Sequence, residues 1–242
     1  MLNKILMTTA CVFASSTAVF AQGFSGAELS IEYSDVTDVE DLGSIIYSGS
    51  AEVELLYGVS AAGDFTIYNF EVDRGNLSNL TGHLSYSINS VTTLGIFFGR
   101  DNTDGEDSGM FGGEIAYDFG VGEAQAYFGS ADDPLAREVT LYGAAVDYDF
   151  GSGFGFEANY DGFTGDDFSA SAFEVGGYYE LQQGLRLGAT IGTLTQEDVA
   201  ETSETFFALK ASIAVGQNGG TTFGPRGVYE VFKANIDAVA VP

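Results

Sequence analysis

Basic residues are scarce in this chain. Its 242 residues include 8 Lys and Arg against 35 Asp and Glu, with a single His, and the formal net charge is −27 at pH 7. Proteins that bind nucleic acid neutralise phosphates with patches of Lys and Arg, so this composition excludes a nucleic-acid partner. The only cysteine, Cys11, lies near the N-terminus. With one His and no other thiol, we expect no disulfide, no metal site and no cofactor.

Long apolar runs are also missing. Outside the N-terminus, no run reaches the roughly 18–20 residues that a transmembrane helix requires. The chain is nevertheless unlike a disordered acidic polymer, because 45% of its residues are apolar and its mean hydropathy is +0.10. The apolar side chains must therefore be distributed over shorter elements.

Residues 1–21 have the order of a secretory signal peptide. Lys4 supplies the positive start, the stretch 5–20 is mostly apolar, and Val19 and Ala21 are the small residues expected before a cleavage site. We expect cleavage before Gln22 and export of the rest of the chain. The expected organisation is a signal peptide at 1–21, one structural unit at 22–214, and a C-terminal tail of uncertain structure at 215–242.

Apolar and polar residues alternate along the rest of the chain, as in strands with one apolar face. The pattern is clear in Glu28–Tyr33, Gly113–Phe119 and Phe154–Asp161. Clusters of Gly, Asn, Asp and Ser separate the alternating runs, as turns require. We therefore predict an all-β fold of about twelve strands. The predicted strands cover 27–34, 49–57, 64–73, 79–88, 92–100, 109–119, 122–130, 137–150, 153–163, 170–181, 184–194 and 203–214.

A repeat accompanies this alternation. Tyr57, Tyr86, Tyr117, Tyr148 and Tyr179 each begin an aromatic–x–apolar strand ending, at intervals of 29, 31, 31 and 31 residues. Each ending precedes a short connection, after which a new strand begins. Solenoids and propellers can have periods of this size, but propeller blades usually contain four strands. We predict an antiparallel up-and-down meander with short turns on one side and longer acidic loops on the other, at 35–48, 101–108, 132–136, 164–167 and 195–202.

On the apolar side of the predicted strands, aromatic residues occur at two heights, one near each end of the strands. The five repeated tyrosines form an expected girdle beside the short turns, and Phe98, Phe128, Tyr160 and Phe206 or Phe207 lie near the longer loops. Two aromatic levels that flank an aliphatic band are typical of a membrane-spanning barrel. The same alternation also fits a soluble barrel or sandwich. The signal peptide, the even strand count and the level aromatics favour a transmembrane antiparallel up-and-down β-barrel.

The alternate residues, which lie on the opposite face of the predicted strands, include many charged ones. So many carboxylates cannot pack into a dry core without partners, but they can line a wet lumen. Two basic residues on the last two predicted strands would face them. The expected lumen-lining residues are Glu52, Glu54, Glu114, Asp118, Asp147, Glu157, Asp161, Glu174, Glu180, Arg186 and Lys210. Many inward positions are small, including Gly112, Gly143, Gly155 and Gly192, which favours an open lumen.

The strand endings Ile115–Gly120 and Val146–Gly151, together with the signal peptide and the meander, resemble Gram-negative outer-membrane porins, and most closely the acidic porins of alphaproteobacteria. The resemblance implies an outer-membrane location and contact with outer-membrane lipid and lipopolysaccharide. It also implies a homotrimer, although a monomer is the alternative for so small a barrel. Two features depart from it. General porins usually have about sixteen strands and a loop folded into the pore. Family members usually end on an aromatic residue, whereas this chain ends on Pro242.

We expect a porin-like channel for passive diffusion of small hydrophilic solutes or ions, with a weak preference for cations because the lumen is acidic. A non-conducting structural or adhesive barrel is the alternative. A more remote alternative is a lipid hydrolase, because His83 and Ser85 resemble the His-x-Ser pair of outer-membrane phospholipase A. Here Leu84 and Tyr86 share the outward parity, which turns His83 and Ser85 inward. We therefore expect no enzymatic activity.

The tail at 215–242 differs from the rest of the chain. Val228, Val231, Phe232, Asn235 and Val239 fit a helical stripe, and the basic residues Arg226 and Lys233 make the segment the least acidic part of the chain. One hypothesis is a short periplasmic-side segment that contacts the acidic lumen. A loosely ordered terminus is the other.

Overall fold

The computed structural model describes residues 23–37, 43–70, 77–103, 106–132, 138–166, 168–182, 184–197, 201–216 and 220–232. The expected signal peptide and the last residues of the tail lie outside these ranges. Within them, no helix is long and apolar enough to cross a membrane.

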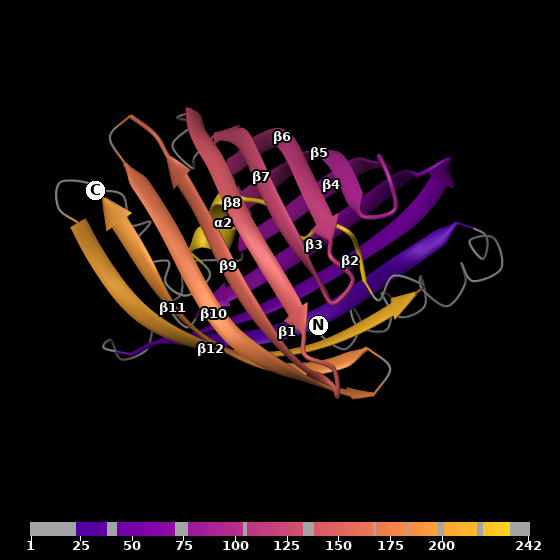
Figure 1. Ribbon diagram of the computed structural model, residues 1–242. Helices are drawn as coiled ribbons and strands as arrows, with labels where there is room; N and C mark the ends of the chain where they lie inside the picture. The colour runs from indigo at the N-terminus through magenta and orange to yellow at the C-terminus, as the bar shows by residue number, and fades with distance from the viewer. Residues whose placement is uncertain are drawn as a thin grey trace, which may run out of the picture.

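Twelve strands form a closed antiparallel barrel in which each strand pairs with its neighbours in the sequence, and β1 pairs with β12 (Figure 1). At this closing seam, Gly26 lies opposite Gly216 and Val36 lies opposite Phe206. The predicted up-and-down barrel is therefore confirmed. The strands are β1 (Phe24–Val36), β2 (Ser44–Leu56), β3 (Val59–Phe70), β4 (Leu77–Ser87), β5 (Thr92–Thr103), β6 (Glu106–Asp118), β7 (Gly122–Asp132), β8 (Glu138–Asp149), β9 (Phe154–Thr164), β10 (Ser169–Gln182), β11 (Leu185–Glu197) and β12 (Glu201–Gly216).

All twelve strands overlap the predicted ones, but most extend further towards the longer connections. The predicted acidic loop at 101–108 is shorter in the structure, because β5 and β6 leave only residues 104 and 105 between them. Alternating polar residues such as Asp101 and Ser108 continue the strand pattern, so their polarity does not end the strands. We call the side of the 57–58, 88–91, 119–121, 150–153 and 183–184 connections the turn side, and the opposite side the loop side.

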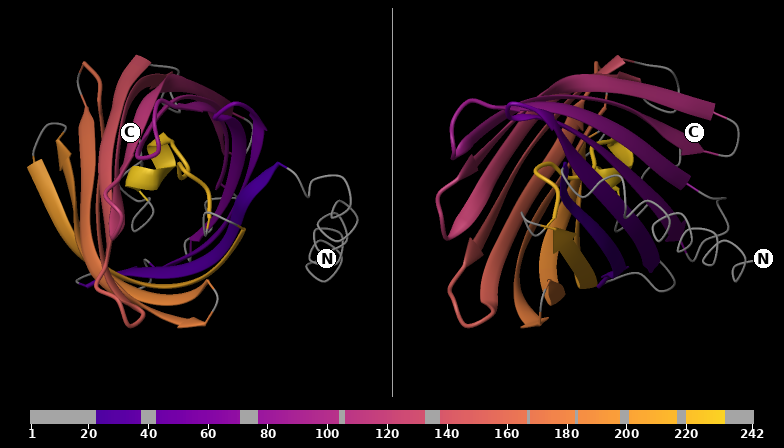
Figure 2. Two further views of the ribbon diagram at one scale, coloured as in Figure 1. Left: turned by 45° about the vertical axis from the view of Figure 1, so that its right-hand side comes forward. Right: turned by 90° about the vertical axis from the view of Figure 1, so that its right-hand side faces the viewer.

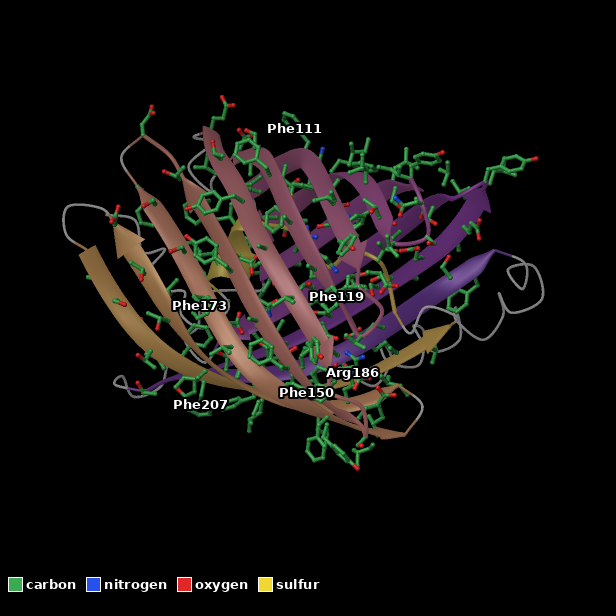
Figure 3. All side chains as sticks on the ribbon, viewed as in Figure 1. Phe111, Phe119, Phe150, Phe173, Arg186 and Phe207 are labelled. Atoms are coloured by element: carbon green, nitrogen blue, oxygen red, sulfur yellow. The ribbon has the colours of Figure 1, made fainter. Side chains whose placement is uncertain are left out.

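The outer face of the barrel is apolar. On β4, Leu84 and Tyr86 are exposed, whereas the adjacent His83 and Ser85 are buried inside, so the predicted parity of this strand is correct. Figure 3 shows Phe111, Phe119, Phe150, Phe173 and Phe207 projecting from the outside of the cylinder. The closed sheet leaves no unpaired strand edge, and its apolar outer band suits contact with lipid. A membrane-spanning barrel requires both properties.

Aspartates close the repeated turns. The Asp118 carboxylate accepts a hydrogen bond from the Gly120 amide, and Asp149 accepts one from Gly151, each at 2.6 Å. Both glycines have positive φ angles, +86° and +76°, which residues without a Cβ adopt at low cost. The repeated Tyr-Asp-Phe-Gly sequence therefore places a tyrosine on the outer face and builds the turn that follows it.

The C-terminal segment 220–232 lies inside the barrel. Figure 2 shows this yellow segment within the ring of strands, ending in the short helix α2 (Val228–Val231). Val228 and Val231, with Phe232 after the helix, are almost fully buried against inward apolar residues of β1 and β5–β12. These wall residues lie mostly in the loop-side half of their strands. The lumen therefore has an apolar seal on the loop side, formed by the protein's own tail.

Candidate luminal site

The tail follows the inner wall of β2–β7. Near its start, the Thr222 amide and hydroxyl donate to the two Glu52 carboxylate oxygens, at 2.8 and 3.2 Å. The Gln125 side-chain amide donates to the Thr222 carbonyl at 2.9 Å. Further along, the Phe223 ring stacks on His83, with centroids 6.0 Å apart. The tail is thus held by side chains of the barrel, as the lumen-contact hypothesis predicts.

Arg226 lies in a pocket of three barrel residues. Its Nε donates to Glu114 Oε2 at 3.2 Å, and its Nη2 donates to Gln125 Oε1 at 3.2 Å. The guanidinium carbon lies 4.5 Å from the centre of the Tyr127 ring, a cation–π distance. Glu114 and Arg226 are both nearly inaccessible to solvent, so little screening weakens this ion pair.

Glu114 also binds His83. His83 Nδ1 lies 2.7 Å from Glu114 Oε1, and Nε2 lies 2.5 Å from Asp64 Oδ2. A neutral imidazole donates from only one ring nitrogen, so the second contact requires one more proton, on the ring or on a carboxyl group. That proton is shared between His83 and its two acidic partners, which offsets the cost of burying them.

Three further residues bind the tail backbone beside Arg226. The Thr81 hydroxyl donates to the Arg226 carbonyl at 3.1 Å. The Asn79 side-chain amide donates to the Arg226 carbonyl at 2.7 Å and to Asp101 Oδ1 at 2.8 Å. The other oxygen of Asp101 accepts from the Val228 amide at 2.8 Å, where α2 begins. These contacts fix the backbone between the ion pair and the apolar seal.

A cavity of about 450 Å³ lies between the tail and the opposite wall, on the turn side of α2. Arg186 and Lys210 line it, as do several carboxylates. The Arg186 guanidinium lies 3.5 Å from Asp147 and 3.6 Å from Glu180, and Lys210 Nζ lies 4.0 Å from Glu28. Lys210 therefore pairs with a carboxylate of the adjacent strand β1, and Arg186 pairs with Glu180 of the adjacent β10. Only the Arg186–Asp147 contact reaches further, from β11 past β10 and β9 to β8.

The predicted lining residues fall into three groups. Glu52, Glu114 and Glu174 are buried inside the barrel, and the first two bind the tail. Those that line the cavity are Asp147, Glu157, Asp161, Arg186 and Lys210. Glu54 and Asp118 lie at the turn-side ends of β2 and β6 and are exposed, and Glu180 pairs with Arg186.

The tyrosines of the predicted girdle are all exposed at the turn side: Tyr57, Tyr86, Tyr117, Tyr148 and Tyr179. Tyr57 differs from the others because it lies in the β2–β3 turn, with a φ of +51°, and not on a strand. Near the loop side, Phe207 is exposed on the outer face whereas Phe206 points into the seal, which decides between the two alternatives.

Five inward glycines do not leave open space here. A Cβ on Gly112 would lie 2.5 Å from the Phe97 ring, and one on Gly129 would lie 2.7 Å from it. Tyr127 covers Gly143, Tyr178 covers Gly155, and Phe206 covers Gly192 in the same way. For these five glycines the interpretation as signs of an open lumen is therefore wrong. Gly188 differs, because it lines the cavity and a Cβ there would meet nothing closer than 3.4 Å. An inward aromatic ring on one strand fills the space that glycine leaves on the neighbouring strand.

Several residues of the tail site are not among those predicted from the sequence. Asp64, Gln125 and Tyr127 have the inward parity of predicted strands, so parity alone could have placed them in the lumen. Asp101 was assigned to a loop. No local signal shows that Arg226 meets Glu114, because the contact depends on the tail turning back into the barrel after β12.

The geometry does not support a hydrolase. The Ser85 hydroxyl contacts the Ser60 carbonyl at 3.5 Å, and both His83 nitrogens are occupied by carboxylates. Nucleophilic catalysis requires a hydrogen bond from the serine to its base, and this arrangement provides none.

No family model matches the chain, and no curated protein is similar to it in sequence. Solved structures do share its fold. It superposes on KdgM porin with a TM-score of 0.57 at 9% identity, over 77% of this chain and 98% of that one. For NanC porin the TM-score is 0.58 at 10% identity, over 76% and 98% of the two chains. For the COG4313 outer membrane channel from Pseudomonas putida F1 it is 0.52 at 12% identity, over 80% and 96%. The chain thus has the fold of outer-membrane porin-type barrels.

Proposed function

We propose that this protein is an outer-membrane channel for small hydrophilic solutes or ions, exported with a signal peptide that is cleaved after residue 21. The observation that carries the proposal is the polar cavity of about 450 Å³ inside a closed barrel with an apolar outer face. An outer face suited to lipid and an inner wall suited to water are the two requirements for passive diffusion across a membrane. The porin-type fold supports the same function.

The tail is the gate of the proposed channel. Because α2 and Phe232 fill the loop-side half of the lumen with apolar side chains, water and solutes pass only when this segment moves. Carboxylates outnumber basic groups along the cavity wall, with Glu28, Glu32, Glu157 and Asp161 among them. The open channel therefore prefers cations.

The test compares the mature chain with a variant that ends at Gly216, each refolded into a planar lipid bilayer under a salt gradient. We expect rare current steps from the mature chain, frequent steps from the truncated variant, and a cation-selective reversal potential. Glu157→Gln combined with Glu174→Gln in the truncated variant should shift the reversal potential towards zero. A folded, heat-modifiable barrel that gives no steps in either form would overturn the proposal.

The apolar seal favours one second candidate, a structural or adhesive barrel that does not conduct. In that case the tail is a permanent part of the core. The truncated variant would then either fail to fold or remain closed to ions, whereas the channel requires a folded and conducting truncated barrel.

A further inference from the structure

The pocket that holds Arg226 is built entirely by the barrel. Glu114 lies on β6, and Gln125 and Tyr127 lie on β7. Together they offer a charged acceptor, a neutral acceptor and an aromatic face, at 3.2, 3.2 and 4.5 Å from the guanidinium. This is the combination that a planar guanidinium group prefers. The pocket therefore remains complete when the tail is absent.

Contacts on the side away from Arg226 fix the orientation of the Glu114 carboxylate. His83 binds its Oε1 and is itself bound to Asp64, so Oε2 faces Arg226. A carboxylate held in this way is preorganised for a cation and loses little conformational freedom on binding. His83 and Asp64 act as positioning residues for the pocket.

The pocket adjoins the cavity. Gln125, Tyr127 and Arg226 all line the cavity wall, together with Phe223 and Pro225 of the tail. A solute in the cavity can thus reach the two β7 residues without crossing the seal. This access rests on the proposed function, because the solute must enter the lumen.

Other ligand classes fit this pocket less well. An anion would meet the Glu114 carboxylate. A metal ion would find too few ligands, since no group of three or more His, Cys, Asp and Glu that could hold one occurs in the described ranges. A primary ammonium is a point charge and would not make the paired in-plane contacts with Glu114 and Gln125 or the stacking on Tyr127.

We propose that this pocket is a binding site for small solutes that carry a guanidinium group, and that Arg226 occupies it as an internal competitor. A bound solute displaces the Arg226 side chain and removes one of the contacts that hold the tail in the lumen. The seal of α2 and the hydrogen bonds to the Arg226 carbonyl remain, so displacement promotes opening without being sufficient for it.

Calorimetric titration of free arginine into the detergent-solubilised barrel tests the site. Citrulline is the matched control, because it replaces the guanidinium with a neutral group of nearly the same shape. We expect Arg226→Ala to bind arginine and not citrulline. The unmodified protein should bind arginine on the order of tenfold more weakly, because its own guanidinium competes. In the Arg226→Ala background, Glu114→Gln should abolish binding, and Gln125→Leu should weaken it on the order of tenfold.

Equal binding of citrulline, or equal affinity in the Arg226→Ala and Arg226→Ala/Glu114→Gln proteins, would overturn the proposal. Heat-modifiability verifies that each variant is folded, and Gln125→Leu keeps the test decisive if Glu114→Gln does not fold. The titration measures binding in detergent and needs no current. A channel that conducts without binding arginine would refute this site alone, and a barrel that binds arginine without conducting would refute the channel alone.

Discussion

Arg226 and Glu114 are 112 positions apart in the sequence, yet Nε of one lies 3.2 Å from Oε2 of the other inside the barrel. The contact joins the tail to β6 in a position that solvent scarcely reaches. Breaking a buried pair by removing one partner is costly, because the remaining charge loses its compensation. This relationship makes the tail part of the barrel's electrostatic balance.

Removing the Glu114 charge should therefore destabilise the protein. We expect Glu114→Ala to lower the free energy of unfolding by about 3–5 kcal/mol, because His83 and Arg226 both lose their common partner. The matched control is Asp107→Asn, which breaks the exposed Arg100–Asp107 contact at 3.4 Å and should cost about 0–1 kcal/mol. Urea titrations of the barrel in detergent micelles measure both. Equal costs would contradict the assigned burial of the cluster.

The two faces of β8 provide a test of the membrane assignment. Ala144 is exposed and has the outward parity of Tyr148, whereas the adjacent Ala145 has the inward parity of the buried Leu141. We expect Ala144→Arg to destabilise the barrel in lipid by about 2–4 kcal/mol, because the charge enters the hydrocarbon. Ala145→Arg should cost less, because its charge lies among lumen carboxylates. Unfolding in lipid vesicles gives the comparison, and the reverse order would show that the faces are misassigned.

Neighbouring glycines on β6 test the packing of aromatic rings over inward glycines. A Cβ on Gly112 would lie 2.5 Å from both the Phe97 ring and the Phe128 carbonyl oxygen, whereas a Cβ on Gly113 would lie 3.9 Å from its nearest neighbour, the Gly95 carbonyl oxygen. We expect Gly112→Ala to cost roughly 1–3 kcal/mol of stability through overpacking. Gly113→Ala should be neutral or slightly stabilising, because alanine restricts the unfolded chain. Similar effects at the two positions would argue against a filled inner wall.

The apolar seal should be weakened by trimming one ring. Phe232 is almost fully buried and meets the Phe163 ring at 5.5 Å between centroids. We expect Phe232→Ala to remove about 3–5 kcal/mol of packing from the docked tail and to raise the frequency of current steps in a bilayer. Phe207→Ala, on the outer face, is the matched control and should leave the step frequency unchanged. An unchanged frequency in Phe232→Ala would mean that α2 does not gate the lumen.

The sequence predicted the barrel well because strand periodicity is a local property. Alternation along β4 and the Tyr-Asp-Phe-Gly endings are visible in single segments, and neither depends on distant partners. Strand ends were less accurate, as at Asp101, because a polar inward residue resembles a loop residue when the lumen is polar.

The luminal site could be predicted only in part. Glu114 and Glu52 were placed in the lumen by parity, but their partners come from the tail, and nothing local in the sequence fixes the register between tail and wall. The inward glycines were misinterpreted for a related reason. Whether a glycine leaves a void depends on the ring carried by the next strand, as for Gly112 and Phe97.

The path of the tail also has a consequence for the order of assembly. Its polar anchors Glu52, Asn79, Asp101, Glu114 and Gln125 lie on five different strands, so the full set of polar anchors is assembled only when β2–β7 are paired. The apolar partners of α2 additionally require β8–β12. The complete docking surface of the tail therefore forms only with the closed barrel, and a barrel that lacks any one of these strands cannot hold the tail in full.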